Sequence, residues 1–178
     1  MNQPRPANGT ERQRLADLRQ LLETLRGLHQ QLLETIERKL AAMRRADFEA
    51  LRVATMQEQQ LVHSIQEREG LRRQLADLLG QQLGLPARGG RTLTVAQLAE
   101  CLAGPARQGL LETADALRAV MNQVVQVNRS AEAVTRRMLE HFEAIFASLA
   151  GLHGPAGAYA GNGGAVGVGT QRILETVG

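Results

Sequence analysis

The longest regular pattern of apolar positions in the chain runs from Leu110 to Leu149. Positions on this pattern recur at alternating steps of four and three, with no glycine or proline in between. This spacing is typical of an α-helix that presents a narrow apolar stripe to partner helices. At about 1.5 Å per residue the helix is roughly 60 Å long, so other helices must lie beside it to bury the stripe. The stripe consists of Leu110, Ala114, Leu117, Met121, Val124, Asn128, Ala131, Thr135, Met138, Phe142, Ile145 and Leu149.

Two more amphipathic segments precede this helix. From residue 11 to about residue 45, leucines and other apolar residues recur at a mean step of about 3.5 and predict a second long helix, with Thr10 as its N-cap. A new apolar phase from Phe48 to Leu83 predicts a third helix, with Asp47 as its N-cap. A single helix across both segments would run to some 70 residues, so we expect a tight turn just before Asp47.

The composition of the remaining segments predicts a connector and a tail. Gly84 to Gly90 is a loop by composition, and Thr94 with Gln97 forms a capping-box pattern that opens a short helix over residues 94–103. Gly104-Pro105 ends that helix, and Pro105 suits the first position of the long one. Residues 151–178 contain nine glycines and predict a tail that does not fold independently.

The predicted fold is therefore all-α. We expect an elongated antiparallel bundle, or coiled coil, of three main helices with a short connector helix and a disordered Gly-rich C-terminal tail. The expected organisation is a disordered leader at 1–10, a helical bundle domain at 11–150 and the flexible tail at 151–178.

Composition favours a binding or structural protein over an enzyme. The 178 residues are 43% hydrophobic but only 2% aromatic, so leucine and alanine must form the core, as in helical bundles. Cys101 is the only cysteine, and the four histidines show no metal-binding spacing, so no metal site or cofactor is expected. Phosphate-binding and nucleophile motifs do not occur.

The charge of the chain and its targeting signals limit the kinds of partner and the location that we expect. The net charge is +3, and the arginines are interleaved with Glu and Gln, which favours a solvated helix surface over a nucleic-acid patch. The first ten residues lack the apolar core of a signal peptide, and no run of about 18 apolar residues could span a membrane. We therefore expect a cytoplasmic protein without nucleic-acid binding or membrane insertion.

Polar residues interrupt the apolar positions of the helices in two ways. Glu58, Glu69 and Arg72 sit at or beside buried positions of the segment 47–83, where Glu69 and Arg72 can pair at i, i+3 on a half-exposed edge. If the helices fold back on one another, His29 and Asn128 fall at similar heights, near Glu58. This predicts a polar layer across the bundle that fixes helix register, or alternatively an Asn128 that merely reaches solvent.

A series of short motifs runs in order along the chain: Leu28-His29-Gln30-Gln31-Leu32-Leu33, Lys39-Leu40, Asp47, Leu51, Glu58, Leu61, Ile65, Glu69, Arg72, Leu75, Leu79-Gly80, Thr92-Leu93, Leu98, Leu117, Asn128 and Tyr159 through Gly164. Taken together, these motifs resemble the FlgN family of flagellar export chaperones. The resemblance spans about residues 12–164, and the order and spacing of the motifs carry it more than any one of them. The chain departs from the family's N-x-x-N stretch, because Val125 and Ala131 stand where a second asparagine would be.

The resemblance implies a chaperone without ATPase activity that holds the terminal helices of hook–filament junction proteins in an export-competent state. Its other partners would be export gate or ATPase components of the flagellar type III system. The cargo-binding part would be the C-terminal half of the long helix and the tail, with Asn128, Met138, Phe142, Ile145, Leu149 and Tyr159 as candidate residues.

Two other functions fit the same pattern. A coiled-coil scaffold or dimerisation module would satisfy its apolar stripe with its own copy and form a stable dimer, whereas a chaperone would be a monomer or a weak homodimer. Nucleic-acid binding through arginine would predict an affinity that falls steeply with salt.

Overall fold

The computed structural model describes residues 9–85 and 93–152, and they form helices without any strand. The helices are α1 (Gly9–Arg44), α2 (Phe48–Gln82), α3 (Val95–Glu100) and α4 (Gly104–Leu152). The all-α prediction and the helix order are confirmed. Thr10 was expected as the N-cap of the first helix, and this is wrong, because α1 already begins at Gly9 and Thr10 lies in its first turn. Residues 1–8 of the expected leader and 153–178 of the expected tail lie outside the described residues, whereas residues 9–10 belong to α1 and residues 151–152 belong to α4.

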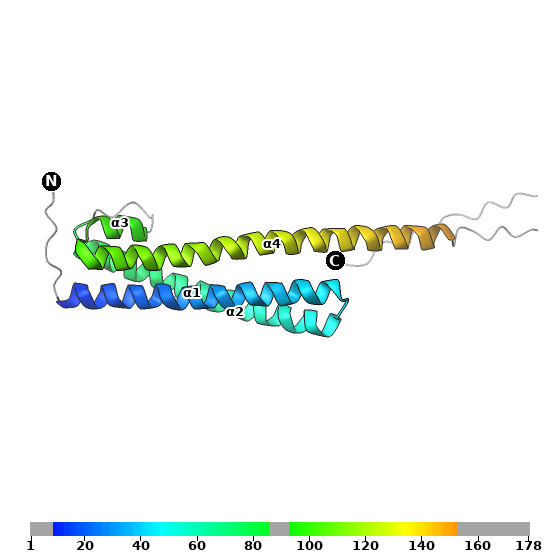
Figure 1. Ribbon diagram of the computed structural model, residues 1–178, viewed down its shortest axis with the longest axis horizontal. Helices are drawn as coiled ribbons and strands as arrows, with labels where there is room; N and C mark the ends of the chain where they lie inside the picture. The colour runs from blue at the N-terminus through cyan, green and yellow to red at the C-terminus, as the bar shows by residue number, and fades with distance from the viewer. Residues whose placement is uncertain (1–8, 86–92, 153–178) are drawn as a thin grey trace, which may run out of the picture. The chain divides into compact units, whose positions relative to one another are not determined.

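The chain divides within α4 into two units, one ending at Arg137 and one beginning at Met138. In the first unit, α1 and α2 form an antiparallel hairpin, and α4 runs beside α1 in the same direction (Figure 1). The hydroxyl of Thr135 lies 3.9 Å from the Met43 sulfur, which places α4 against the C-terminal end of α1.

A tight turn at Arg45–Asp47 reverses the chain between α1 and α2. The N–H of Asp47 donates to the carbonyl of Ala42 at 3.0 Å and that of Ala46 donates to Met43 at 3.2 Å, which is the hydrogen-bond pair of a Schellman motif. The side chain of Asp47 then accepts the N–H of Ala50 at 3.0 Å. Asp47 thus ends one helix and caps the next, and both the predicted turn and the predicted N-cap are confirmed.

The connector also follows its sequence signals. α2 ends in a second Schellman motif, in which Gly84 has a positive φ of 71° and Leu85 donates to the carbonyl of Gly80 at 2.9 Å. The capping box before α3 is formed, since Gln97 N–H donates to the Thr94 hydroxyl and Thr94 N–H donates to the Gln97 side chain. Pro105 lies in the first turn of α4, where its missing N–H costs no helical hydrogen bond.

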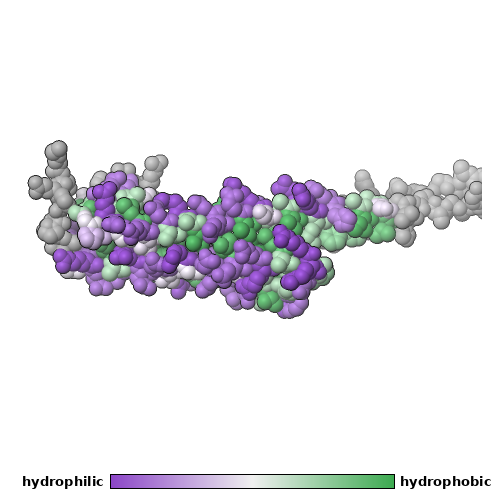
Figure 2. Space-filling view, in the orientation of Figure 1, coloured by the Kyte–Doolittle hydropathy of each residue, from purple (hydrophilic) through white to green (hydrophobic). Residues whose placement is uncertain are grey.

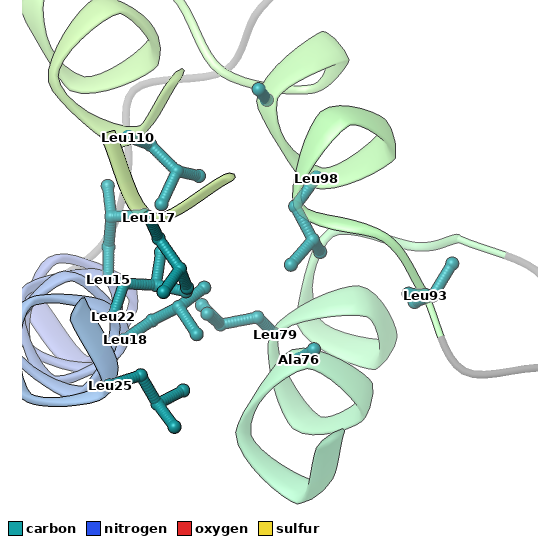
Figure 3. Packing of buried hydrophobic residues seen from close by; sticks show 11 residues of the cluster. Leu15, Leu18, Leu22, Leu25, Ala76, Leu79, Leu93, Leu98, Leu110 and Leu117 are labelled. Carbon is teal, nitrogen blue, oxygen red and sulfur yellow. The ribbon is translucent and has the colours of Figure 1, made fainter. Parts of the chain in front are cut away.

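Leucine side chains from all four helices fill the core near the start of α1. Figure 3 shows Leu18, Leu22 and Leu25 of α1 with Leu79 of α2, and Leu98 of α3 on the other side. A fully buried leucine stabilises a fold by about 1.5–3 kcal/mol, so this cluster holds the short α3 in place as well as the long helices. Nearer the turn a smaller cluster contains Leu32, Ile36 and Leu40 of α1 with Ala131 of α4.

Candidate functional site

The apolar stripe of α4 is buried in one part and exposed in another. In the first unit, Leu110, Leu117 and Ala131 belong to the core clusters, although Met121 on the same stripe is 41% exposed. In the second unit, Phe142, Ile145 and Leu149 leave 44%, 41% and 47% of their surface exposed, while Met138 is half-buried. The sequence repeat is the same along the whole stripe, so burial separates a packing surface from a candidate binding surface.

Two further apolar residues widen this exposed surface. Leu139 is 58% exposed and Phe146 is 68% exposed, both more than their neighbours on the stripe. At about 100° per residue, the arc from Ile145 through Phe142 to Leu139 covers about 120° of the helix circumference. The sequence analysis missed both residues because they stand one position after the four-three repeat. We refer to Met138, Leu139, Phe142, Ile145, Phe146 and Leu149 as the α4 apolar surface.

Exposed apolar side chains gathered on one helix face make it a candidate binding surface, because single exposed apolar residues are common but clusters are not. Figure 2 shows hydrophobic side chains continuing along the last described turns of α4. Glu140 and Glu143 stand on the same turns and are exposed, so they keep the helix soluble on its other sides.

The predicted polar layer across the bundle is wrong. His29 is buried, but its Nδ1–H donates to the carbonyl of Leu25, one turn back in α1, at 2.8 Å. The amide of Asn128 donates to the Glu132 carboxylate, one turn on in α4, at 3.3 Å. Each side chain is satisfied by its own helix, which local geometry makes easier than a hydrogen bond between helices. Asn128 is half-buried beside the core rather than part of a register-fixing network.

Glu58, Glu69 and Arg72 of α2 sit at half-exposed positions, as expected. Glu69 pairs with Arg72 at 2.9 Å within α2, which confirms the predicted i, i+3 pair. Glu58 pairs with Lys39 of α1 across the hairpin, and the two side chains are only 21% and 15% exposed. The partner of Glu58 was not predicted, because the residue opposite it depends on the register of the turn.

Near the start of α2, the exposed ion pair between Glu49 and Arg52 shifts the pKa of both groups. The hydrogen bond from Arg52, reinforced by its charge, holds the pKa of Glu49 below its ordinary value. The same hydrogen bond raises the pKa of Arg52 above its ordinary value. Both groups are fully charged at neutral pH, so the pair marks a charged surface and not an acid–base site.

The described residues offer no group of three or more His, Cys, Asp or Glu side chains that could hold a metal ion. In the same part of the chain, no helix combines the length and the apolar character needed to cross a membrane. What the geometry does present is an exposed apolar surface along one helix face.

The comparison with known families bears on this surface. The FlgN family model, described as FlgN protein, matches residues 14–167, which is most of the chain. The chain belongs to the FlgN family. No curated protein and no solved structure matches it. FlgN proteins are a family of flagellar export chaperones and are not known as enzymes, so the general role of this FlgN protein is that of a flagellar export chaperone. Tyr159 falls within the matched range but lies outside the described residues.

Proposed function

We propose that this FlgN protein acts in the cytoplasm, where it binds the terminal helices of hook–filament junction proteins and delivers them to the export gate or ATPase of the flagellar type III system. The observation that carries the proposal is the exposed α4 apolar surface in a chain of this family. A cargo helix would lie along this surface in the helix-in-groove mode, with apolar residues at i, i+3, i+4 and i+7.

The area of the α4 apolar surface limits the binding affinity that this surface can provide alone. Burying the exposed half of one such side chain contributes roughly 1 kcal/mol, so the six residues contribute roughly 6 kcal/mol. Micromolar affinity requires about 8 kcal/mol net, and association itself has a cost of about 4 kcal/mol or more. Cargo binding therefore needs further contact, and we propose that the tail with Tyr159 provides it.

The test compares aspartate substitutions on two faces of the same helix. Phe142→Asp and Ile145→Asp place a charge in the α4 apolar surface, and Ala147→Asp places the same charge on the opposite face. Co-purification with the hook–filament junction proteins of the same organism should be lost for the first two variants and kept for the third. Circular dichroism should show equal helicity in all three variants.

Two results would refute this placement. If Phe142→Asp still binds cargo, the surface is not the cargo site. If both Phe142→Asp and Ile145→Asp unfold the protein, the residues belong to a core.

A coiled-coil scaffold is the second candidate, since the same exposed surface could pack against its own copy. The two functions differ in the mass of the free protein and of its complex. A scaffold is a stable dimer that Phe142→Asp dissociates, whereas a chaperone forms a one-to-one complex with cargo that the same substitution disrupts.

A further inference from the structure

The α4 apolar surface is exposed in the described part of the chain, and the sequence beyond α4 contains a short apolar stretch. This stretch runs from Gln171 to Val177. Ile173 and Leu174 are the only isoleucine and leucine after Leu152, where α4 ends. The role proposed above for the tail relies on Tyr159 and leaves this stretch without a function. We call residues 171–177 the C-terminal segment.

The residue order in the C-terminal segment favours a helix over a strand. On a helix, at about 100° per residue, Ile173, Leu174 and Val177 share an arc of about 100°. The charged Arg172 and Glu175 then fall on the opposite side. A strand would instead place Glu175 between Ile173 and Val177 on one face. Because a helix this short is not stable in isolation, it forms only where another surface covers its apolar side.

The α4 apolar surface matches the C-terminal segment in length and in shape. From Leu139 to Phe146 the surface extends along about 10 Å of helix, and the C-terminal segment as a helix is about as long. The apolar arc of the segment is about 100° wide and that of α4 is about 120° wide, as in a pair of packed amphipathic helices. The segment can therefore cover Leu139, Phe142 and Phe146 together.

The chain between α4 and the C-terminal segment has a suitable length to join them. Residues 153–170 include seven glycines among 18 residues. A glycine-rich chain of this length has a root-mean-square end-to-end distance of roughly 20–25 Å. The helix from Leu152 back to Leu139 is about 20 Å long. The linker therefore reaches the whole α4 apolar surface, and it is short enough to hold the segment there at a millimolar effective concentration.

We propose that the C-terminal segment binds the α4 apolar surface of its own chain as a short helix, and that a cargo helix must displace it. Both would present apolar residues on one helix face to the same side chains of α4, so the two cannot bind together. The segment would also shield exposed apolar side chains from non-specific association while no cargo is present. Its effect on cargo binding rests on the proposed function, whereas the contact with α4 does not.

The contact is weak enough for cargo to reverse it. It buries only three apolar side chains of the segment, Ile173, Leu174 and Val177, whereas a cargo helix can extend over further turns of α4. A segment with a millimolar dissociation constant, held at a millimolar effective concentration, covers the surface for about half of the time or more. Such coverage lowers the apparent affinity for cargo by about two- to tenfold, because only the uncovered fraction can bind.

A nitroxide label tests the contact in the full chain without any cargo. Cys101 is the only cysteine, so Cys101→Ser with Gly178→Cys leaves one labelling site beside the C-terminal segment. The label should broaden the amide NMR signals of Phe142 and Phe146. Leu174→Asp should remove most of this broadening, because it places a charge in the apolar face of the segment.

Two controls accompany the label. Thr176→Asp adds the same charge outside the apolar arc and should leave the broadening unchanged. A mixture of isotope-labelled chains and separate nitroxide-labelled chains should show no broadening, since the segment binds its own chain. Equal broadening with and without Leu174→Asp would overturn the proposal. So would broadening in the mixture, because the segment would then bind a second copy.

Cargo affinity tests the displacement, with a hook–filament junction protein of the same organism as the probe. Removal of residues 171–178 should raise the affinity by about two- to tenfold, because the competitor is lost. Leu174→Asp should raise it similarly, and Thr176→Asp should not change it. Removal of residues 154–178 should lower the affinity, because Tyr159 is lost as well. A lower affinity after removal of residues 171–178 alone would overturn the proposal, since the segment would then bind cargo.

The two experiments separate this proposal from the proposed function. If Phe142→Asp leaves cargo binding intact, cargo binds elsewhere and displacement of the segment is refuted with it. Broadening that Leu174→Asp removes would still support the contact between the segment and α4. Conversely, cargo binding that Phe142→Asp abolishes, in a chain whose label causes no broadening at Phe146, would support the proposed function and overturn the contact.

Discussion

Leu93 packs directly onto the backbone of Gly80, so closely that a Cβ at position 80 would fall 1.9 Å from the Leu93 Cδ1. Both residues are buried, and the contact ties the chain just before α3 to the last turns of α2. Gly80 is helical, so its missing side chain serves this contact rather than a turn. In most helix interiors glycine would cost about 1 kcal/mol relative to alanine.

Gly80→Ala should therefore destabilise the protein, although alanine is the better helix former. The new methyl group displaces Leu93, whose burial is worth about 1.5–3 kcal/mol, and the helix gains only about 1 kcal/mol. We expect a net loss of about 1 kcal/mol in the free energy of unfolding, measured by chemical denaturation.

Two controls separate the clash from helix propensity. In a Leu93→Ala background, Gly80→Ala should become stabilising, since no atom of Leu93 then opposes the methyl group. Gly27→Ala should stabilise by about 1 kcal/mol in the native background, because a Cβ there meets nothing within 4 Å. Additive effects of Gly80→Ala and Leu93→Ala would show that the contact carries no energy.

Ala46 is the one described non-glycine residue with a positive φ, at 54°. The left-handed conformation costs an L-residue roughly 1 kcal/mol, and glycine adopts it freely. Ala46→Gly should raise the free energy of unfolding by about 0.5–1 kcal/mol. Ala119→Gly in the middle of α4 should lower it by about 1 kcal/mol in the same denaturation assay. A loss of stability in both variants would mean that the turn adopts another geometry.

The Lys39–Glu58 ion pair joins α1 to α2 from half-buried positions. Lys39→Met alone leaves the Glu58 carboxylate partly desolvated without its cation, so we expect a loss of about 1–3 kcal/mol. Lys39→Met with Glu58→Leu should recover most of that loss, because both polar groups are then removed. Arg118→Met breaks the exposed pair with Asp115 and should cost less than about 0.5 kcal/mol. A double variant no more stable than Lys39→Met would show that the pair packs through its carbon chains.

Helix-forming signals that act locally could be predicted from the sequence. The capping residues Asp47 and Thr94 bond within three residues of themselves, so their roles do not depend on the rest of the fold. The partners of His29, Asn128 and Glu58 do depend on it. The first two form hydrogen bonds to a carbonyl or a carboxylate of their own helix, and the partner of Glu58 depends on the register of the turn.

Only part of the α4 apolar surface could be predicted from the sequence, for a related reason. The repeat, with alternating steps of four and three residues, predicts which positions can face a partner helix, and it continues unchanged from Leu110 to Leu149. It does not predict how far along this helix the partner helices extend. The exposed fractions of Leu139 and Phe146 emerge only when the helices are placed in space.

The division of the α4 stripe gives the last prediction. Leu117 and Ile145 occupy the same type of position in the repeat, but Leu117 is 6% exposed and Ile145 is 41% exposed. Leu117→Ala should lower the free energy of unfolding by about 2–5 kcal/mol, because it leaves a cavity in the core. Ile145→Ala should change it by less than about 1 kcal/mol, since the lost contacts are few and alanine favours the helix. The two variants should be compared at low protein concentration, where no second copy can cover Ile145. Equal losses for the two variants would place Ile145 in a core and would remove the α4 apolar surface as a binding site.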